Sequence, residues 1–379
     1  MTTHTLFIVA GEKSGENYGA NLVRQFKKRW PSSRFFGIGG SGMEAEGVEI
    51  LFPMEDLAVV GVVEILSHLP RIRRIYHQLI GEVKRRKPSA AVLIDSPDFN
   101  LRLAKRLKKI SVPVLYYISP TVWAWRPGRL KTIKKNVAKM LLIFPFEEGL
   151  YREKEIPARY IGHPLLERIH VTLDKEAFAQ KYGLDPQKKI ITLLPGSRRS
   201  EIRFHMPVLV RAVEKLHRAL PCQFLLVLAG NPDSDFLNKT IPPGLNDFKI
   251  LTEDGYAAMA SSDLILSACG TANLEAALLG TPFISFYRIS PLTYYAGVRL
   301  VKISHFSIVN ILAGTKIIPE LIQRRFTAEN VFQEARTILN SKQIQDEMKS
   351  NLGRIRALLG EAHASENAAQ ELDRLIHSS

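Results

Sequence analysis

Cysteine is scarce in this sequence: only Cys222 and Cys269 occur among its 379 residues. Two cysteines in apolar, strand-like surroundings argue against a disulfide framework or a cysteine-based metal site, and they suit a reducing cytoplasm. Histidine, aspartate and glutamate also form no cluster with the spacing of metal ligands. We therefore expect no tightly bound metal and no cofactor.

Long hydrophobic runs are missing as well. No run reaches the roughly 18 uninterrupted apolar residues that a membrane-spanning helix needs. The N-terminal run Leu6–Ala10 is too short for the core of a signal peptide, and no basic leader precedes it. We therefore expect a cytoplasmic protein that neither crosses a membrane nor is exported.

Acidic residues are in short supply: 52 lysines and arginines stand against 37 aspartates and glutamates, which gives a net charge of +15. The excess is concentrated in residues 1–165, with 27 basic and 15 acidic side chains, whereas residues 166–379 have 25 and 22. A basic first half predicts an anionic partner, either a membrane surface or a nucleic acid.

The apolar segment 57–69 favours the membrane. Basic clusters follow it at 71–74 and 84–87, and a partly inserted helix flanked by cations would bind an anionic leaflet. The alternative is a buried helix with a solvated basic neighbour. Only Tyr76 and Phe99 lie near the basic runs as aromatic residues, and there is no recognition motif, so we expect no nucleic acid partner.

Short β-rich apolar runs alternate with amphipathic segments along the chain, which is typical of parallel sheets with helices on both faces. The pattern restarts after about residue 165, so we predict an α/β fold of two Rossmann-like domains facing each other across a cleft. The expected domains are 1–165 and 166–340, and a helical tail, 341–379, is expected to return to the first domain. The predicted strands are 5–10, 34–38, 90–95, 113–118, 139–144, 159–161, 189–194, 222–229, 247–251, 263–267 and 282–286. The predicted helices include 15–29, 99–110, 147–154, 201–219, 254–261, 271–279 and 327–339.

The turn Pro195–Arg198 follows the apolar run Ile190–Leu194 and precedes a helical segment. The first N–H groups of a helix are unpaired and lie at the positive end of its dipole, so they bind anions. An arginine adds a bidentate phosphate donor. Gly196, Ser197 and Arg198 are therefore predicted to bind a phosphate.

A second turn of this kind follows another predicted strand of the second domain. Ser267, Gly270 and Thr271 offer hydroxyl and N–H groups to a diphosphate, and Glu275 is placed to accept hydrogen bonds from a ribose diol. The alternative is a capped helix with a solvated Glu275. Because both turns lie in one domain and ligands bind beyond the carboxyl ends of parallel strands, we predict a nucleotide diphosphate there.

Polar residues also follow two predicted strands of the first domain. The loop Ala10–Asn17 fits neither a P-loop nor a dinucleotide-binding pattern. Its two glutamates suit sugar hydroxyls, although a plain strand-to-helix turn is an equal alternative. Asp95 and Asp98 lie at the end of the strand 90–95, and Asp98 is predicted to be a general base, with a helix N-cap as the alternative.

Together these motifs resemble those of the lipid-A-disaccharide synthase family. Glu16 departs from the aspartate that the family often has at this position. The resemblance implies a GT-B fold and a metal-independent, inverting glycosyltransferase of lipid A biosynthesis. The matching segments keep their order and spacing over nearly the whole chain, and they are Ala10–Glu16, Asp95–Asn100, Ser119–Trp125, Gly162–Pro164, Leu194–Arg198 and Ser267–Thr271.

The resemblance also implies the substrates and the place of reaction. The donor would be UDP-2,3-diacylglucosamine and the acceptor 2,3-diacylglucosamine 1-phosphate, and the products would be the β-1′,6-linked lipid A disaccharide 1-phosphate and UDP. The enzyme would be peripheral on the cytoplasmic face of the bacterial inner membrane, at an anionic phospholipid surface, with a homodimer as one possible state. A UDP-sugar 2-epimerase or a muramyl-lipid glycosyltransferase of similar architecture is the alternative.

The resemblance assigns roles to the predicted site residues. Asp98 would accept the proton of the acceptor's 6-hydroxyl, and Arg198 with the helix dipoles would stabilise the leaving diphosphate in place of a metal. The acceptor site would comprise Ser14, Gly15, Glu16, Asp95 and Asn100. The nucleotide-sugar site would comprise Gly196, Ser197, Arg198, Ser267, Gly270, Thr271, Glu275, Asn310, Glu320 and Gln323.

Overall fold

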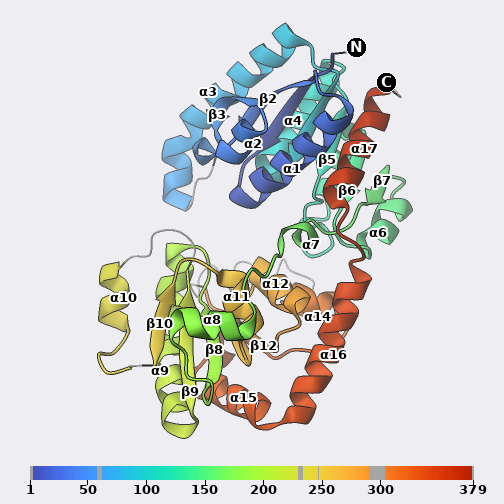
Figure 1. The fold of residues 1–379 in the computed structure, drawn as a ribbon. Coiled ribbons are helices and arrows are strands. Elements are labelled where there is room, and N and C mark those ends of the chain that lie inside the picture. The colour runs from blue at the N-terminus through green and yellow to red at the C-terminus, as the bar shows by residue number, and fades with distance from the viewer. Residues whose placement is uncertain (1–2, 58–61, 229–233, 246, 290–303, 378–379) are drawn as a thin grey trace. The chain divides into compact units, whose positions relative to one another are not determined.

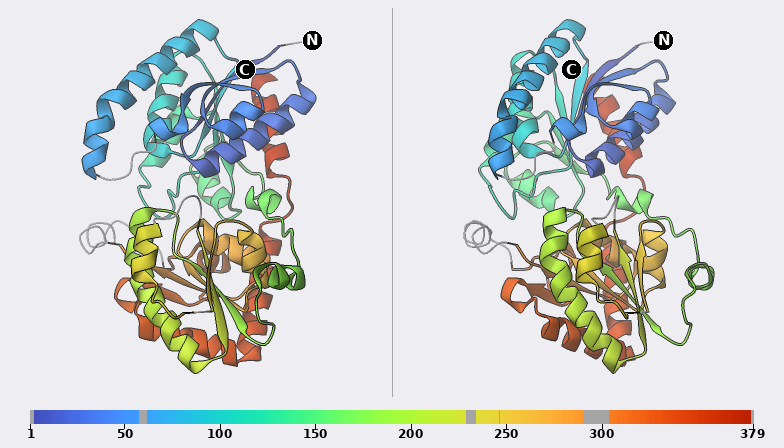
Figure 2. Two further views of the ribbon diagram at one scale, coloured as in Figure 1. Left: turned by 60° about the vertical axis from the view of Figure 1, so that its left-hand side comes forward. Right: turned by 90° about the vertical axis from the view of Figure 1, so that its left-hand side faces the viewer.

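The chain forms two compact α/β units in the computed structural model, which describes residues 3–57, 62–228, 234–245, 247–289 and 304–377. Unit 1 comprises Met1–Glu167 and Leu359–Ser379, and unit 2 comprises Arg168–Leu358. Each unit has one sheet with helices packed on it (Figures 1 and 2). All strand pairs within the described residues are parallel, so the predicted fold class is confirmed.

The sheet of unit 1 has seven strands in the order β3-β2-β1-β4-β5-β6-β7. Strands β2 and β3 lie on one side of β1, and strands β4 to β7 lie on the other side. β1 and β4 are therefore parallel neighbours, and their carboxyl ends lie at the same edge of the sheet. The elements are β1 (Thr5–Ala10), α1 (Lys13–Arg29), β2 (Arg34–Gly39), α2 (Ser41–Ala45), β3 (Val48–Pro53), η1 (Met54–Asp56), α3 (Val62–Arg86), β4 (Ala90–Ile94), α4 (Pro97–Lys109), β5 (Val114–Tyr117), α5 (Arg129–Asn136), β6 (Lys139–Leu142), α6 (Glu147–Glu153), β7 (Ala158–Tyr160), α7 (Leu165–Arg168) and α17 (Ala364–His377).

The sheet of unit 2 has six strands in the order β10-β9-β8-β11-β12-β13. Here β8 and β11 are the central neighbours. The elements are α8 (Lys175–Tyr182), β8 (Lys189–Leu194), α9 (Arg199–Ala219), β9 (Cys222–Val227), α10 (Ser234–Thr240), β10 (Phe248–Leu251), α11 (Gly255–Ser261), β11 (Leu264–Ala268), α12 (Thr271–Leu279), β12 (Phe283–Tyr287), α14 (Ile308–Ala313), β13 (Glu320–Ile322), η2 (Gln323–Arg325), α15 (Ala328–Asn340) and α16 (Lys342–Leu358).

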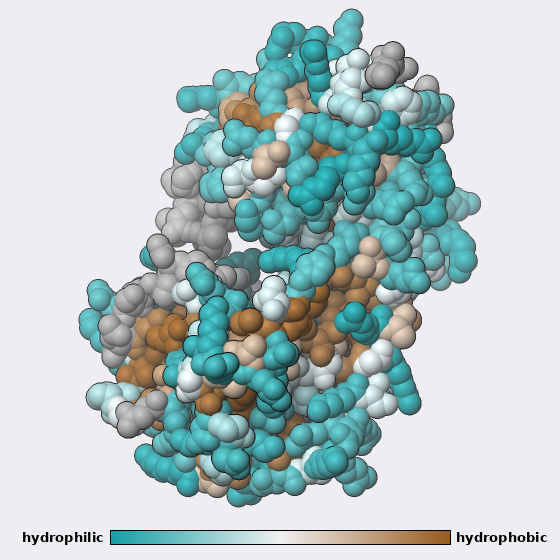
Figure 3. Space-filling view, in the orientation of Figure 1, coloured by the Kyte–Doolittle hydropathy of each residue, from teal (hydrophilic) through white to brown (hydrophobic). Residues whose placement is uncertain are grey.

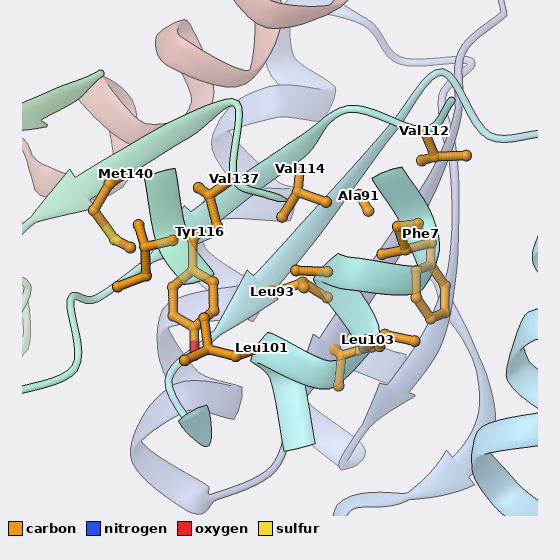
Figure 4. Close-up of a cluster of buried hydrophobic side chains, with 14 of the residues drawn as sticks. Phe7, Ala91, Leu93, Leu101, Leu103, Val112, Val114, Tyr116, Val137 and Met140 are labelled. Atoms are coloured by element: carbon orange, nitrogen blue, oxygen red, sulfur yellow. The ribbon is translucent and has the colours of Figure 1, made fainter. Parts of the chain in front are cut away.

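The core of unit 1 lies on both faces of its sheet because successive side chains of a strand point to opposite faces. Phe7 of β1 belongs to the cluster that α4 covers with Leu103 and Leu107 (Figure 4). Ile8 belongs to the cluster on the other face, which α1 and α17 cover. The strands are therefore apolar along their whole length, as two-sided burial requires.

The segment 341–379 was expected to be one tail, and the structure divides it between the units. Met348 and Leu352 of α16 are buried in unit 2, whereas Ala368 and Leu372 of α17 are buried on the sheet of unit 1. Each helix has an apolar stripe that needs its own partner surface. The expected return to the first domain is thus made by α17 alone.

Two short strands, β3 and β13, are not among the predicted strands. β3 mixes polar and apolar residues, and β13 begins with a charged residue and has only two apolar ones. The predicted apolar segment 57–69 falls partly on 58–61, which lie outside the described residues. Its remainder opens α3, which continues through the basic cluster 71–74. Among the helices that the structure describes, none combines the length and apolar content needed to cross a bilayer.

Surface character differs within the units. The visible face of unit 1 that carries α1 and α17 is mainly hydrophilic, whereas apolar residues reach the surface of unit 2 around α11, α12 and α14 (Figure 3).

Candidate active site

Two strand-to-helix turns meet at the carboxyl edge of the unit 1 sheet. Ala10 at the end of β1 pairs with Ile94 at the end of β4, so the turns that follow are neighbours. They approach so closely that a Cβ on Gly11 would lie 2.5 Å from Ser96 Oγ. A side chain at position 11 would push the Ser96 hydroxyl out of its place, so glycine suits this position.

The turn after β4 holds Asp95 in an unusual backbone conformation. Asp95 and Ser96 both have left-handed φ angles, 48° and 42°, which are costly for residues other than glycine. The Asp95 carbonyl accepts hydrogen bonds from Tyr116 Oη at 2.6 Å and Asn100 Nδ2 at 2.9 Å. These two bonds fix the turn and with it the direction of the Asp95 side chain.

The Asp95 carboxyl group is suited to proton transfer. Burial, with a smaller contribution from the Glu12 carboxylate, raises its pKa to about 6. A carboxyl group with this pKa exchanges a proton near neutral pH, which an ordinary aspartate does not do.

Asp98, the predicted base, lies in the first turn of α4, whose N-cap is Ser96. The N-cap alternative for Asp98 is therefore wrong. Its side chain is 75% exposed, and Oδ1 accepts hydrogen bonds from Arg129 Nη2 at 2.6 Å and Arg126 Nη1 at 3.1 Å. Both guanidinium groups stabilise the carboxylate, but they also occupy one of the two oxygens that would accept a proton.

The other predicted acceptor residues lie in or against α1 and α4. Ser14 and Gly15 are in the first turn of α1, and Gly15 packs closely on Ile94. Glu16 is fully buried and accepts hydrogen bonds from Gly42 N at 2.6 Å and Lys13 Nζ at 2.6 Å. Asn100 is also fully buried and holds the end of β4. Glu16 and Asn100 therefore support the turns, and direct sugar contact by either is a prediction that this geometry does not favour.

In unit 2, the phosphate-binding turn predicted at 195–198 lies between β8 and α9. Its backbone donors already have a partner: Glu201 Oε2 accepts hydrogen bonds from Ser197 N at 3.2 Å and Arg198 N at 3.3 Å. Gly196 has a φ of 120°, and a Cβ there would lie 2.6 Å from the same oxygen. The Arg198 side chain is 57% exposed, so its guanidinium is accessible to a ligand.

The second predicted turn, after β11, is adjacent to the first because Ser267 pairs with Leu194. Gly270 and Thr271 are exposed at the start of α12, and no side chain caps this helix. Ser267 is different: it is fully buried, and its hydroxyl accepts a hydrogen bond from Asn273 Nδ2 at 2.9 Å. The N-terminus of α12 is therefore open to an anion, whereas Ser267 supports it from within.

Glu275 lies in the second turn of α12. It is partly buried, and burial raises the pKa of its carboxyl group. The Tyr256 hydroxyl donates a hydrogen bond to it at 3.0 Å. The other oxygen of this carboxylate could accept hydrogen bonds from a diol.

Asn310, Glu320 and Gln323 lie around β13. The buried Asn310 side chain donates to Glu320 Oε1 at 2.9 Å, and that carboxylate also accepts from Ser307 N at 2.8 Å. The Gln323 carbonyl accepts a hydrogen bond from Arg288 Nη2 at 3.2 Å. Asn310 and Glu320 therefore form an internal network beside α14, and their contact with a ligand stays a prediction.

His205 was missed by sequence reasoning. Its ring is fully buried, with Nδ1 2.6 Å from the Pro195 carbonyl, and Nε2 accepts a hydrogen bond from Arg288 N at 3.0 Å. It joins the turn after β8 to the end of β12, two strands away. A histidine one turn beyond Glu201 on the buried face of α9 was the only available signal.

The structure thus brings Asp95 and Ser96 together with Gly11 in unit 1, and the 195–198 turn together with Gly270 and Thr271 in unit 2. Within the described residues, no group of three histidine, cysteine or acidic side chains is arranged to hold a metal ion.

Known proteins match this chain over nearly its whole length. Residues 6–372 match the family model described as lipid-A-disaccharide synthetase. The lipid-A-disaccharide synthase of Koribacter versatilis is 42% identical over 380 residues, covering 98% of each chain. That of Syntrophus aciditrophicus is 40% identical, covering 100% of each chain.

Solved structures share the fold at low identity. The chain matches a glycotransferase of kitacinnamycin with a TM-score of 0.65 and 12% identity, covering 99% of this chain and 100% of that one. It matches the UDP-GlcNAc 2-epimerase of Neisseria meningitidis with a TM-score of 0.63 and 11% identity, covering 100% of both. The fold is of the GT-B type found in glycosyltransferases.

Proposed function

Because the chain belongs to the lipid-A-disaccharide synthase family, and is a glycosyltransferase of lipid A biosynthesis, we propose that it joins two acylated glucosamines. It transfers 2,3-diacylglucosamine from UDP-2,3-diacylglucosamine to the 6-hydroxyl of 2,3-diacylglucosamine 1-phosphate, with inversion at the anomeric carbon. The products are the β-1′,6-linked disaccharide 1-phosphate and UDP. The family match over residues 6–372 carries this proposal.

We assign the donor to unit 2. The open N-terminus of α12 offers backbone N–H groups and the Thr271 hydroxyl to the diphosphate, and Arg198 adds a charged donor. Glu275 accepts hydrogen bonds from the ribose. These groups stabilise the negative charge that grows on the diphosphate as it leaves.

We assign the acceptor to unit 1 and favour Asp95 over Asp98 as the general base. Asp95 is partly buried, has a pKa of about 6 and is held in a fixed turn, whereas Asp98 is exposed and bound to two arginines. The base takes the proton of the 6-hydroxyl as its oxygen attacks the anomeric carbon from the side opposite UDP. The bond from that carbon to the diphosphate breaks, and UDP departs with the electron pair.

We also propose that unit 1 binds an anionic phospholipid surface on the cytoplasmic face of the inner membrane. Arg102, Lys105, Arg106 and Lys109 lie at positions i, i+3, i+4 and i+7 and are all exposed on α4. Among the described residues, none of the four forms an ion pair. A single-sided row of uncompensated cations is suited to lipid phosphates.

A turnover assay tests the proposed reaction. The two diacylglucosamine substrates are incubated with the protein, UDP release is measured, and the linkage of the product is determined by NMR. UDP release that needs both substrates and yields a β-1′,6 linkage supports the proposal. UDP-2,3-diacylglucosamine consumption that does not depend on the acceptor contradicts it.

A further inference from the structure

Glu201 lies where the turn at 195–198 would hold an anion. Its carboxylate accepts hydrogen bonds from Ser197 N at 3.2 Å, Arg198 N at 3.3 Å and Arg198 Nη1 at 3.3 Å. This is the donor set, two backbone N–H groups and a guanidinium, that suits a phosphate. In this structure a side chain of the protein itself therefore takes the place of an anionic ligand.

The carboxylate is held loosely. Charge-assisted N–H···O hydrogen bonds are usually about 2.7–2.9 Å long, and the contacts from the two backbone N–H groups and the guanidinium are all at least 3.2 Å. A further partner lies outside the turn: the Tyr287 hydroxyl at the end of β12 is 3.3 Å from Glu201 Oε1. Tyr287 binds the carboxylate in the same conformation as the turn does, so it could stay a partner if the carboxylate left the turn.

We propose that Glu201 is an internal substitute for the donor's diphosphate. Without donor it satisfies the turn and keeps Arg198 in position. On binding, the diphosphate displaces it from the turn, and the Tyr287 hydroxyl remains its partner. This inference rests on the proposed donor site in unit 2. Its consequence is that UDP binds more weakly than the donor groups alone would allow, which eases product release.

Isothermal titration of the full-length protein tests the inference, with UDP and uridine as probes. Glu201→Gln keeps an acceptor for the turn but removes the competing charge, so we expect UDP to bind roughly tenfold more tightly, a change of about 1.4 kcal/mol. Uridine has no phosphate, and its affinity should not change. Glu214→Gln, on the same helix α9, is the matched control and should alter neither affinity.

Tyr287→Phe removes the partner of Glu201 outside the turn. A residue that only caps the helix would not make UDP affinity depend on this substitution. We expect this substitution to weaken UDP binding severalfold in the wild-type background and to have no effect in the Glu201→Gln background. Thermal unfolding of each variant without ligand identifies any variant that has lost its fold. The effects of Tyr287→Phe on UDP affinity in the two backgrounds are then compared only for variants that are folded.

The outcomes separate the inference from the function on which it rests. If Glu201→Gln leaves UDP affinity unchanged or lowers it, while Arg198→Ala weakens UDP binding, Glu201 is only a helix cap and the inference fails alone. If Arg198→Ala leaves UDP affinity unchanged, the proposed donor site itself is wrong.

Discussion

Two carboxylates three residues apart differ in their electrostatic surroundings. Asp95 is partly buried near Glu12 and has a raised pKa, whereas Asp98 is exposed and bound by Arg126 and Arg129. Burial disfavours the charged form, and adjacent cations favour it. The chemical difference between the two residues therefore comes from their neighbours and not from their side chains.

We expect Asp95→Asn to lower kcat by at least about 100-fold, the usual contribution of a general base, and Asp98→Asn to lower it much less. Wild-type activity should fall as the pH drops below about 6, because protonated Asp95 cannot accept the hydroxyl proton. Steady-state rates between pH 5 and 8 check both expectations. A larger loss in Asp98→Asn than in Asp95→Asn would restore Asp98 as the base.

Glu147 gives a test of stability at the same scale. It is buried, accepts a hydrogen bond from Phe144 N at 3.3 Å, and burial raises the pKa of its carboxyl group from 4.5 to about 7. Folding therefore favours the protonated form. The stability that this group contributes is fully present below pH 4.5 and is lost as the pH rises through about 7.

Glu147→Gln should accordingly stabilise unit 1 at pH 8 by up to about 3 kcal/mol and have little effect at pH 4.5. Denaturant unfolding at the two pH values measures the difference. Glu153→Gln, an exposed change on the same helix, is the control. Equal effects of Glu147→Gln at both pH values would show that the buried charge is not the cause.

At the scale of elements, the strand-to-helix turns are held by side chains from neighbouring segments. Glu16 of α1 binds the N-terminus of α2, Asn100 of α4 binds the end of β4, and Asn273 of α12 binds Ser267 of β11. Each polar side chain satisfies backbone or hydroxyl groups that would otherwise be buried without partners. The turns can then present other residues in a fixed geometry.

Glu16→Ala should lower the free energy of unfolding by about 1–3 kcal/mol, because Gly42 N and Met43 N lose their acceptor in a buried position. Thermal or denaturant unfolding measures the loss. Glu44→Ala, at an exposed position of α2, should change stability little. If turnover of Glu16→Ala collapses at temperatures where the variant remains folded, Glu16 contacts a substrate after all.

Much of the element pattern could be predicted because two-sided burial makes strands such as 189–194 and 222–227 continuously apolar. The positions of the two turns of unit 2 could be predicted because each turn directly follows such an apolar strand. The directions of individual polar side chains could not. Asn310 and Glu320 follow the same sequence logic as ligand-binding residues, yet they bind each other, because pairing across a loop leaves no periodic signal in the sequence.

At the scale of the whole molecule, basic charge is distributed unequally between the two halves of the chain. The excess lies in residues 1–165, and α4 presents four of these cations on one exposed face. Near an anionic bilayer each such cation contributes about 1 kcal/mol of attraction, which salt weakens.

Lys105→Glu with Lys109→Glu should therefore reduce binding to vesicles that contain phosphatidylglycerol by at least about tenfold. Co-sedimentation at low and high salt measures the effect. Lys342→Glu with Lys349→Glu, exposed on α16 of unit 2, makes the same change in net charge and should have a smaller effect. Equal losses in both pairs would mean that net charge, and not the face of α4, governs binding.

The packing of α17 on unit 1 has a consequence for synthesis of the protein. Ala364, Ala368 and Leu372 complete the apolar cluster on one face of a sheet whose strands all precede residue 161. During translation, domains usually fold in the order in which they emerge. Here the first sheet to be made stays partly uncovered until about 200 further residues have been added, so unit 2 has all its strands before unit 1 can close. We infer that the N-terminal half is the part of the nascent chain most dependent on chaperones.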